Sequence, residues 1–172
     1  MTAPTPDSSL RALTEADFER VIALARRIWL SHFIKIVSRE QIEYMMNARL
    51  TTLNLRRYLH ADERWFDVLR LHDEPVGYCS YALTATAGEI KLEQLYLSPE
   101  LRGRGLGGLM LRHVQSRAQA LGCRTMVLQV NKQNTGPVAV YRAAGFTVRE
   151  EAVFDIGHGF VMDDYVMEKR LG

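Results

Sequence analysis

Apolar side chains recur at helical spacing through the first third of the chain. Thr14 followed by Asp17, and Ser38 followed by Gln41, each precede such a run and have the form of a capping box. The spacing predicts two amphipathic helices, each with one apolar stripe facing a core. The stripes comprise Phe18, Val21, Ile22, Ala25, Ile28 and Trp29 in the first helix, and Ile42, Met45, Met46 and Leu50 in the second. Residues 51–60 add one or two further helical turns.

From residue 64 onward the period becomes that of extended chain. Residues 64–72 and 76–84 are strand-like runs, and the "DEP" between them predicts an antiparallel hairpin. Residues 90–97 alternate as a third strand of the same meander, which Pro99 ends. A short strand over residues 10–13 precedes the first helix.

The second half of the chain contains a strand-helix-strand unit and two closing strands. A helical stripe begins at Leu106 and ends before Gly122, a residue that favours helix termination. Residues 125–130 are nearly all apolar, as in a strand covered on both faces. Because a helix connects them to the strand at residues 90–97, the two strands are predicted to pair in parallel. A short helix at residues 138–144 and the segments "FTVREEAVF" and "DDYVMEKRL" complete the pattern. The fold class is therefore predicted to be mixed α/β.

Length and composition favour one globular domain. The chain has 172 residues and a net charge of +2, so we expect a domain over residues 10–172 after a tail of residues 1–9, with no nucleic-acid partner. No apolar run approaches the roughly 18 to 20 residues that span a bilayer, and the N-terminus does not have the pattern of a secretion signal. Cys79 and Cys123 are too few for a disulfide framework and lack metal-ligand spacing. We therefore expect a cytoplasmic protein with no membrane partner and no metal.

The stretch "SPELRGRGLGGLML" (residues 98–111) has the features of an anion-binding loop. Glycines leave backbone amides uncovered, arginines add positive charge, and the N-terminus of the predicted helix adds its dipole. The glycines are Gly103, Gly105, Gly107 and Gly108, and the arginines are Arg102 and Arg104. This combination predicts a site for a phosphate-bearing ligand.

Two common phosphate ligands fit this loop poorly. It contains a literal G-x-G-x-x-G, but Pro99 and four more residues separate the strand from the first glycine, and no acid stands at residues 129–131 to bind a ribose. A triphosphate loop requires Gly-Lys-Ser/Thr at the helix start, where this chain has Gly-Gly-Leu. The pyrophosphate of coenzyme A, held by amides and arginines without a metal, fits better.

Two motifs make the chain similar to the GNAT N-acetyltransferase superfamily. The first, Arg/Gln-x-x-Gly-x-Gly/Ala after a strand, is matched by Arg102, Gly105 and Gly107; the second, Asn followed seven residues later by Tyr and then Gly-Phe, is matched by Asn134, Tyr141, Gly145 and Phe146. The resemblance runs from Leu10 to Leu171 and extends to the bacterial branch that includes spermidine and spermine acetyltransferases. It implies a GNAT fold: a central, mostly antiparallel twisted sheet of six to seven strands with one parallel β-α-β unit and flanking helices.

The same resemblance implies acetyl-CoA as the cosubstrate. Amides from Arg102 to Gly108 would hold the pyrophosphate at the start of the helix that begins near Leu106. The strand containing residues 95–97 would bulge from its neighbour, and its backbone groups would bind pantetheine and polarise the thioester carbonyl. Asn134 would contact the coenzyme or cap the following helix. The implied cofactor-binding residues are Leu95, Tyr96, Leu97, Arg102, Gly103, Arg104, Gly105, Leu106, Gly107, Gly108, Asn134 and Tyr141.

Two residues are candidates for proton transfer. Tyr141, by resemblance, is the general acid, because a phenol with a pKa near 10 can protonate a departing thiolate and be reset by solvent. Glu93 lies on the strand that leads to the thioester and is the candidate general base, directly or through water. An amphipathic tyrosine in the core and a solvated glutamate are the structural alternatives.

We expect acetyl transfer to a primary amine of a small molecule, with a polyamine as one candidate, directly in a ternary complex. Asp155, Asp163 and Asp164 are candidates for an acidic wall that would receive a polycation. A protein or peptide N-acetyltransferase and a non-catalytic acyl-CoA-binding sensor are the alternatives. The resemblance also allows a homodimer.

Overall fold

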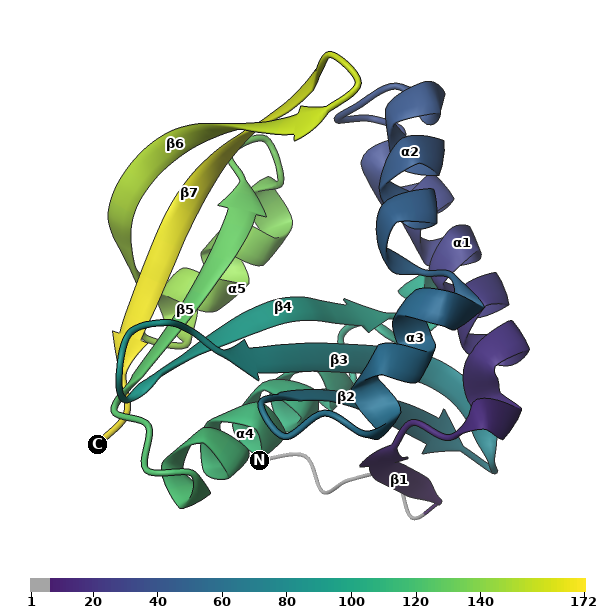
Figure 1. The fold of residues 1–172 in the computed structure, drawn as a ribbon, viewed down its shortest axis with the longest axis horizontal. Coiled ribbons are helices and arrows are strands. Elements are labelled where there is room, and N and C mark those ends of the chain that lie inside the picture. The colour runs from purple at the N-terminus through teal and green to yellow at the C-terminus, as the bar shows by residue number, and fades with distance from the viewer. Residues whose placement is uncertain (1–6) are drawn as a thin grey trace. The chain divides into compact units, whose positions relative to one another are not determined.

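The computed structural model describes residues 7–172, so most of the predicted N-terminal tail lies outside the described residues. Figure 1 labels the helices and strands along the chain. The strands are β1 (Ser8–Ala12), β2 (Arg64–Leu71), β3 (Glu74–Leu83), β4 (Glu89–Leu97), β5 (Thr125–Asn131), β6 (Thr147–Gly157) and β7 (Phe160–Arg170). The helices are α1 (Phe18–Phe33), α2 (Arg39–Arg49), α3 (Thr52–Leu59), α4 (Leu106–Ala120) and α5 (Thr135–Ala143), with the short 3-10 helices η1 (Glu15–Asp17) and η2 (Pro99–Leu101).

The strands form one seven-stranded sheet in the order β1-β2-β3-β4-β5-β7-β6. The β4–β5 pair is parallel, and the β1–β2, β2–β3, β5–β7 and β6–β7 pairs are antiparallel. α4 connects the two parallel strands, as the apolar strand-helix-strand pattern predicts. The predicted mixed α/β class and the parallel unit are confirmed.

The helix starts follow the predicted capping residues. The Asp17 carboxylate accepts the backbone N–H of Thr14 at 2.9 Å, which completes a capping box at η1 before α1 begins. The Ser38 hydroxyl accepts the backbone N–H of Gln41 at 3.1 Å and caps α2. The predicted turns over residues 51–60 are helix α3, which the Thr51 side chain caps.

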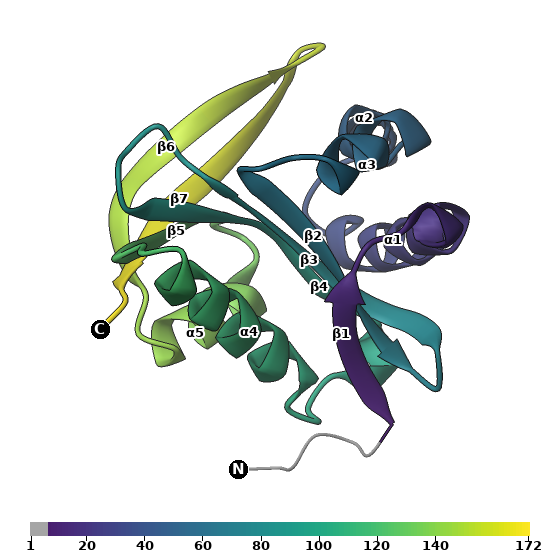
Figure 2. The same ribbon diagram turned by 60° about the horizontal axis from the view of Figure 1, so that its bottom comes forward.

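The chain divides into two compact units. The first comprises the chain up to Ala82 together with Gln94–Val114, and the second comprises Leu83–Glu93 together with Gln115–Gly172. In the first unit, α1, α2 and α3 cover one face of β2 and β3 (Figures 1 and 2). Trp29 of α1 lies in this core and donates its indole N–H to the Tyr78 hydroxyl at 2.8 Å, which satisfies a buried donor.

The beginning of α4 covers the other face of the same strands (Figure 2). Leu106 and Met110 of α4 pack with Leu69 of β2 and Leu97 of β4 in a second apolar cluster. The start of α4 is therefore held against the sheet by buried side chains.

In the second unit, β7 lies between β5 and β6. The β5–β7 ladder runs from Thr125↔Arg170 to Asn131↔Asp164, and β6 and β7 form a long hairpin. Arg149 of β6 donates to Glu168 of β7 and to Glu89 of β4, each at 2.8 Å. This network connects the start of the parallel pair to the closing hairpin.

The structure moves several predicted boundaries. α5 begins at Thr135, three residues before the predicted start, because Pro137 is accepted in the first turn of a helix. β1 begins at Ser8, two residues earlier than predicted, and β7 begins at Phe160 rather than Asp163. The 3-10 helix η2 was not predicted. Its start at Pro99 satisfies the fixed φ of proline.

Candidate functional site

Residues 102–108, which we call the glycine-rich loop, connect η2 to the first turn of α4. Gly103 and Gly105 have φ angles of 79° and 80°, in the left-handed region that side chains disfavour. A Cβ atom at Gly103 would meet no atom within 4 Å. The backbone conformation, rather than lack of space, therefore calls for glycine at this position.

Two buried leucines hold the loop at its ends. Leu101 and Leu106 are 9% and 2% exposed and belong to the same apolar cluster. Residues 102–105 between them are all exposed. The loop thus presents its backbone to solvent between two fixed points.

The loop carries positive charge that the protein does not neutralise. Arg102 and Arg104 are exposed and form no ion pair with any of residues 7–172. The first turn of α4 contains no acidic residue, and this helix of 15 residues directs its positive dipole end toward the loop. Unneutralised arginines, accessible glycines and a helix N-terminus fit a phosphate-bearing ligand.

Residues Leu95, Tyr96 and Leu97 form the end of β4 before this loop. A Cβ atom at Gly77 of β3 would lie 2.8 Å from the carbonyl oxygen of Tyr96, so the two backbones require glycine for their close approach. Tyr96 is half-buried, and its ring lies 5.6 Å from that of Trp29. Leu97 is buried in the apolar cluster that also contains Leu101 and Leu106, and the partly buried Leu95 packs against that cluster.

The parallel ladder covers only the first part of β4. It runs from Glu89↔Thr125 to Leu92↔Leu128, while β4 continues to Leu97 and β5 to Asn131. Glu93, the candidate base, directly follows the last of these pairs and is half-buried.

Asn134 and Tyr141 both belong to the α5 region of the second unit. The Asn134 backbone carbonyl accepts the N–H of Val138 at 3.1 Å, but its side chain makes no capping bond, so the capping alternative is wrong for the side chain. Tyr141 is half-buried, with its ring 5.7 Å from that of Phe146. The Tyr141 carbonyl also accepts the N–H of Phe146 at 3.0 Å.

The acidic residues predicted to receive a polycation mostly have structural roles. The Lys132 ammonium lies 2.9 Å from Asp163, and Asp155 accepts the backbone N–H of Gly157 at 2.8 Å at the end of β6. Asp164 is only 6% exposed. The prediction of an acidic wall is therefore wrong for Asp164, whose carboxylate is buried. It stays a prediction for Asp155 and Asp163, although Lys132 balances the charge of Asp163.

The cysteines and two of the histidines have ordinary structural environments. Both cysteines are free thiols and buried, and burial raises the pKa of Cys79 and of Cys123. His32 packs on Phe33 with ring centres 4.9 Å apart, and His158 lies in the β6–β7 turn with a φ angle of 58°. These four residues therefore have packing or turn positions in the structure.

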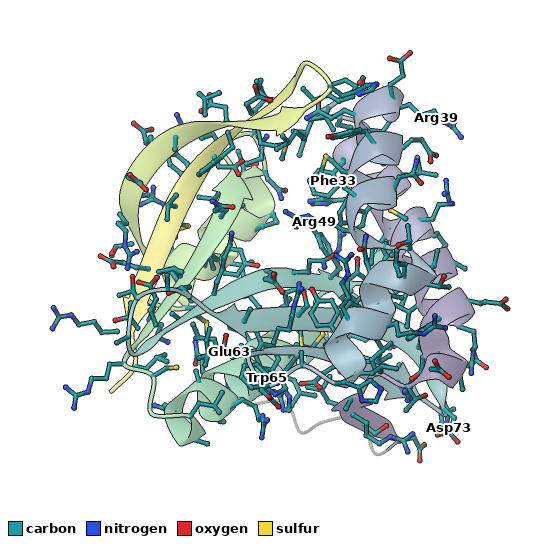
Figure 3. All side chains as sticks on the ribbon, viewed as in Figure 1. Phe33, Arg39, Arg49, Glu63, Trp65 and Asp73 are labelled. Atoms are coloured by element: carbon teal, nitrogen blue, oxygen red, sulfur yellow. The ribbon has the colours of Figure 1, made fainter. Side chains whose placement is uncertain are left out.

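Sequence reasoning missed a buried polar cluster beneath α4. Asp67 of β2 is 8% exposed, and one of its carboxylate oxygens accepts the Tyr81 hydroxyl at 2.6 Å and lies 2.8 Å from Nε2 of His113. Figure 3 labels Trp65 near the start of β2, and its ring stacks on that of Tyr81 at 5.5 Å. Sequence spacing gave no signal for this cluster, because its members lie on three separate elements.

A shallow pocket of about 280 Å³ occurs elsewhere in the first unit. Arg11 and Arg70 line it, but each forms an ion pair with an aspartate, Asp73 and Asp17 respectively. The pocket therefore has no excess charge to attract a phosphate. Among the described residues, no helix is long and apolar enough to cross a membrane.

Comparison with known proteins connects this arrangement to a family. Residues 19–146 match the family described as "Acetyltransferase (GNAT) family". The chain is 25% identical over 165 residues to a spermidine N(1)-acetyltransferase from Thermoplasma acidophilum, covering 94% of this chain and 96% of the relative. It is 28% identical over 149 residues to a peptidyl-lysine N-acetyltransferase from Salmonella typhimurium, covering 86% and 88%.

Two further matches differ in coverage. Over 97 residues the chain is 28% identical to an uncharacterized N-acetyltransferase from Methanocaldococcus jannaschii, and it spans 43% of that protein's length. Among solved structures, the PaiA N-acetyltransferase of Thermoplasma acidophilum in complex with coenzyme A superimposes with a TM-score of 0.80 at 23% identity, covering 95% of this chain and 98% of that one. The expected fold is confirmed by this superposition.

Proposed function

Because the chain belongs to the GNAT acetyltransferase family, we propose that it transfers an acetyl group from acetyl-CoA to a primary amine of a small molecule. The observation that carries this proposal is the glycine-rich loop, where Arg102 and Arg104 are exposed and make no ion pair with residues 7–172. Such a loop at the N-terminus of a long helix suits the pyrophosphate of coenzyme A.

The backbone groups of β4 are proposed to orient the donor. Residues 95–97 lie beyond the last parallel pair, Leu92↔Leu128, so their peptide groups are candidates to bind pantetheine amides. A backbone N–H directed at the thioester oxygen would stabilise the negative charge that develops there during attack. In this role the backbone acts, while the Leu97 side chain remains in the apolar cluster and the Leu95 side chain packs against it.

The transfer requires two bond changes and three proton movements. The neutral amine nitrogen forms the bond to the thioester carbon, the carbon–sulfur bond breaks, and the sulfur leaves as a thiolate. The nitrogen then loses its remaining extra proton to solvent and becomes the amide nitrogen. Tyr141 is proposed to give its phenolic proton to that thiolate, and Asn134 to contact the coenzyme. Glu93 is proposed to take the proton that the acceptor ammonium loses, directly or through water. The transfer is proposed to be direct, and the burial of Cys79 and Cys123 supports this proposal because it disfavours a cysteine acyl-enzyme.

The acceptor class is proposed from two relatives. The spermidine acetyltransferase matched over nearly its whole length supports a polyamine. The peptidyl-lysine acetyltransferase supports a lysine side chain as the alternative acceptor. Both acceptors present a primary aliphatic amine, so the same chemistry serves either one.

Calorimetric titration with acetyl-CoA, with NADH and ATP as controls, tests the donor site. We expect saturable binding of acetyl-CoA that an Arg102→Ala, Gly105→Ala double variant loses. A thiol-release assay with spermidine, spermine and a lysine peptide then tests transfer. Binding of acetyl-CoA without thiol release for any acceptor would favour a sensor over an enzyme. Binding of a control ligand in place of acetyl-CoA would refute the proposal.

A further inference from the structure

Ser98, the residue between β4 and η2, is completely buried and has every polar group engaged. Its backbone N–H donates to the carbonyl of Val76 at 2.8 Å, and its carbonyl accepts the N–H of Leu101 at 3.0 Å. Its hydroxyl accepts a hydrogen bond from Arg27 Nη2 at 2.8 Å and donates one to Glu100 Oε1 at 3.0 Å. Ser98 is thus the fixed point from which the chain leaves the sheet toward the glycine-rich loop.

Glu100 is the second partner of this junction. Its own backbone N–H lowers the pKa of the Glu100 carboxyl, and the Ser98 hydroxyl and the Arg27 charge lower it further. The carboxylate oxygen lies 3.7 Å from Arg27 Nη2. At neutral pH the carboxylate is therefore ionised and closes the Arg27–Ser98–Glu100 arrangement.

Arg27 reaches this junction from α1, 71 residues away in the chain. Its side chain is 62% exposed, and an ion pair at such a site contributes little to global stability. The hydrogen bond to a fully buried hydroxyl is different, because it selects one position of the Ser98 side chain. The contact therefore acts on local geometry more than on the stability of the fold.

We propose that Arg27 is a positioning residue for the coenzyme, which sets the start of the glycine-rich loop through Ser98 and Glu100. The inference rests on the proposed binding of coenzyme A pyrophosphate at that loop. Ser98 and Leu101 fix one end of the exposed segment, and Leu106 fixes the other. With both ends fixed, less conformational freedom is lost when the phosphates bind, and affinity rises accordingly.

The test compares Arg27→Met with Arg26→Met. Arg26 is the neighbouring residue on α1, is 46% exposed, and pairs with Glu43 at 2.7 Å, so it serves as a matched control. We expect Arg27→Met to weaken coenzyme A binding in calorimetry about fivefold to tenfold, while Arg26→Met leaves it unchanged. Arg27→Lys retains a hydrogen-bond donor, so it should bind coenzyme A more tightly than Arg27→Met and less tightly than the wild-type protein.

Ser98→Ala and the Arg27→Met, Ser98→Ala double variant separate positioning from direct contact. We expect Ser98→Ala to weaken binding to a similar extent and the double variant to be no weaker than either single one. Full affinity in Ser98→Ala together with a loss in Arg27→Met would mean that Arg27 touches the phosphates itself, and would overturn the proposal. Equal affinity of Arg27→Met and Arg26→Met would also overturn it.

A truncated donor distinguishes loop positioning from a general structural effect. S-acetylpantetheine lacks the pyrophosphate, so Arg27→Met should raise KM for acetyl-CoA but not for S-acetylpantetheine, with kcat unchanged for both. An equal rise in both KM values would refute positioning at the loop. If the wild-type protein itself does not bind coenzyme A, the proposed function fails first. If only the variant comparison fails, the proposed function stands and the role of Arg27 does not.

Discussion

The imidazole Nε2 of His113, on α4, lies 2.8 Å from a carboxylate oxygen of Asp67, on β2. The same oxygen accepts the hydroxyl of Tyr81 from β3 at 2.6 Å. One buried carboxylate thus connects two strands to the helix that begins at the glycine-rich loop. Removal of the Asp67 carboxylate would take this acceptor away from the Tyr81 hydroxyl and from the His113 imidazole.

Tyr81→Phe should lower the free energy of unfolding by about 1 to 2 kcal/mol, because Asp67 loses a charge-assisted hydrogen bond in a buried site. Urea unfolding at neutral pH measures the change. Tyr165→Phe serves as the control. The hydroxyl of Tyr165 has no hydrogen bond to other described residues, so its removal should have little effect on the free energy of unfolding. Equal stability of the two variants would show that the Tyr81–Asp67 hydrogen bond contributes nothing to stability.

Alanine substitutions at Gly103 and at Gly107 should differ in their effect on the stability of the fold. Gly103→Ala places a side chain at a φ of 79° and should cost about 1 kcal/mol of stability. Gly107 lies in the first turn of α4 with open space around it, so Gly107→Ala should leave stability unchanged or slightly higher. Its methyl group should nevertheless reduce coenzyme A affinity. Thermal unfolding and calorimetry check both effects, and unchanged affinity in Gly107→Ala would place the phosphates elsewhere.

Tyr141→Phe should lower kcat about a hundredfold while coenzyme A affinity stays at the wild-type value, because only the proton donor is lost. Steady-state thiol release and calorimetry give the two quantities. A variant with wild-type kcat would return Tyr141 to a packing role beside Phe146.

Glu93→Gln should lower the rate at neutral pH and recover part of it in more alkaline buffer, where more of the acceptor amine is already neutral. A pH profile of kcat/KM tests this expectation. Glu150→Gln, a change at an exposed acid on β6, is the control. A Glu93→Gln variant with the full rate at neutral pH would remove Glu93 from the mechanism.

The free energy of unfolding should fall as the pH rises into the alkaline range. Burial raises the pKa of Tyr78 above its usual 10.0, and burial together with the Asp67 charge raises the pKa of Cys79 above its usual 9.0. The folded state then keeps protons that the unfolded state releases. Once the pH exceeds the usual pKa of a group, that group therefore lowers the free energy of unfolding by up to about 1.4 kcal/mol per pH unit. Urea unfolding between about pH 8 and about pH 10.5 measures the slope, and Cys79→Ala should reduce it. A slope that Cys79→Ala leaves unchanged would contradict the contribution of this thiol.

The predicted elements agree with the structure where the signal is local. The stripe from Phe18 to Trp29 is buried as α1, and the cap at Ser38 starts α2, because periodicity and capping depend on residues three or four apart. The glycine-rich loop was predicted for the same reason, since its glycines and arginines adjoin the helix that completes it. The predicted start of α5 at residue 138 is three residues too late, because apolar spacing begins at Val138 and gives no signal for the polar and glycine residues of the first turn.

By itself, the sequence determined the order of the main helices and strands, the parallel unit, and the glycine and arginine content of the glycine-rich loop. Only the tertiary structure decided which distant side chains meet. In the folded protein Arg27 contacts Ser98, Asp67 contacts His113, and Lys132 forms an ion pair with Asp163. Those contacts depend on strand register and on the packing of helices against the sheet. Both are set by burial of the whole core, and neither leaves a repeating pattern in the residues nearby.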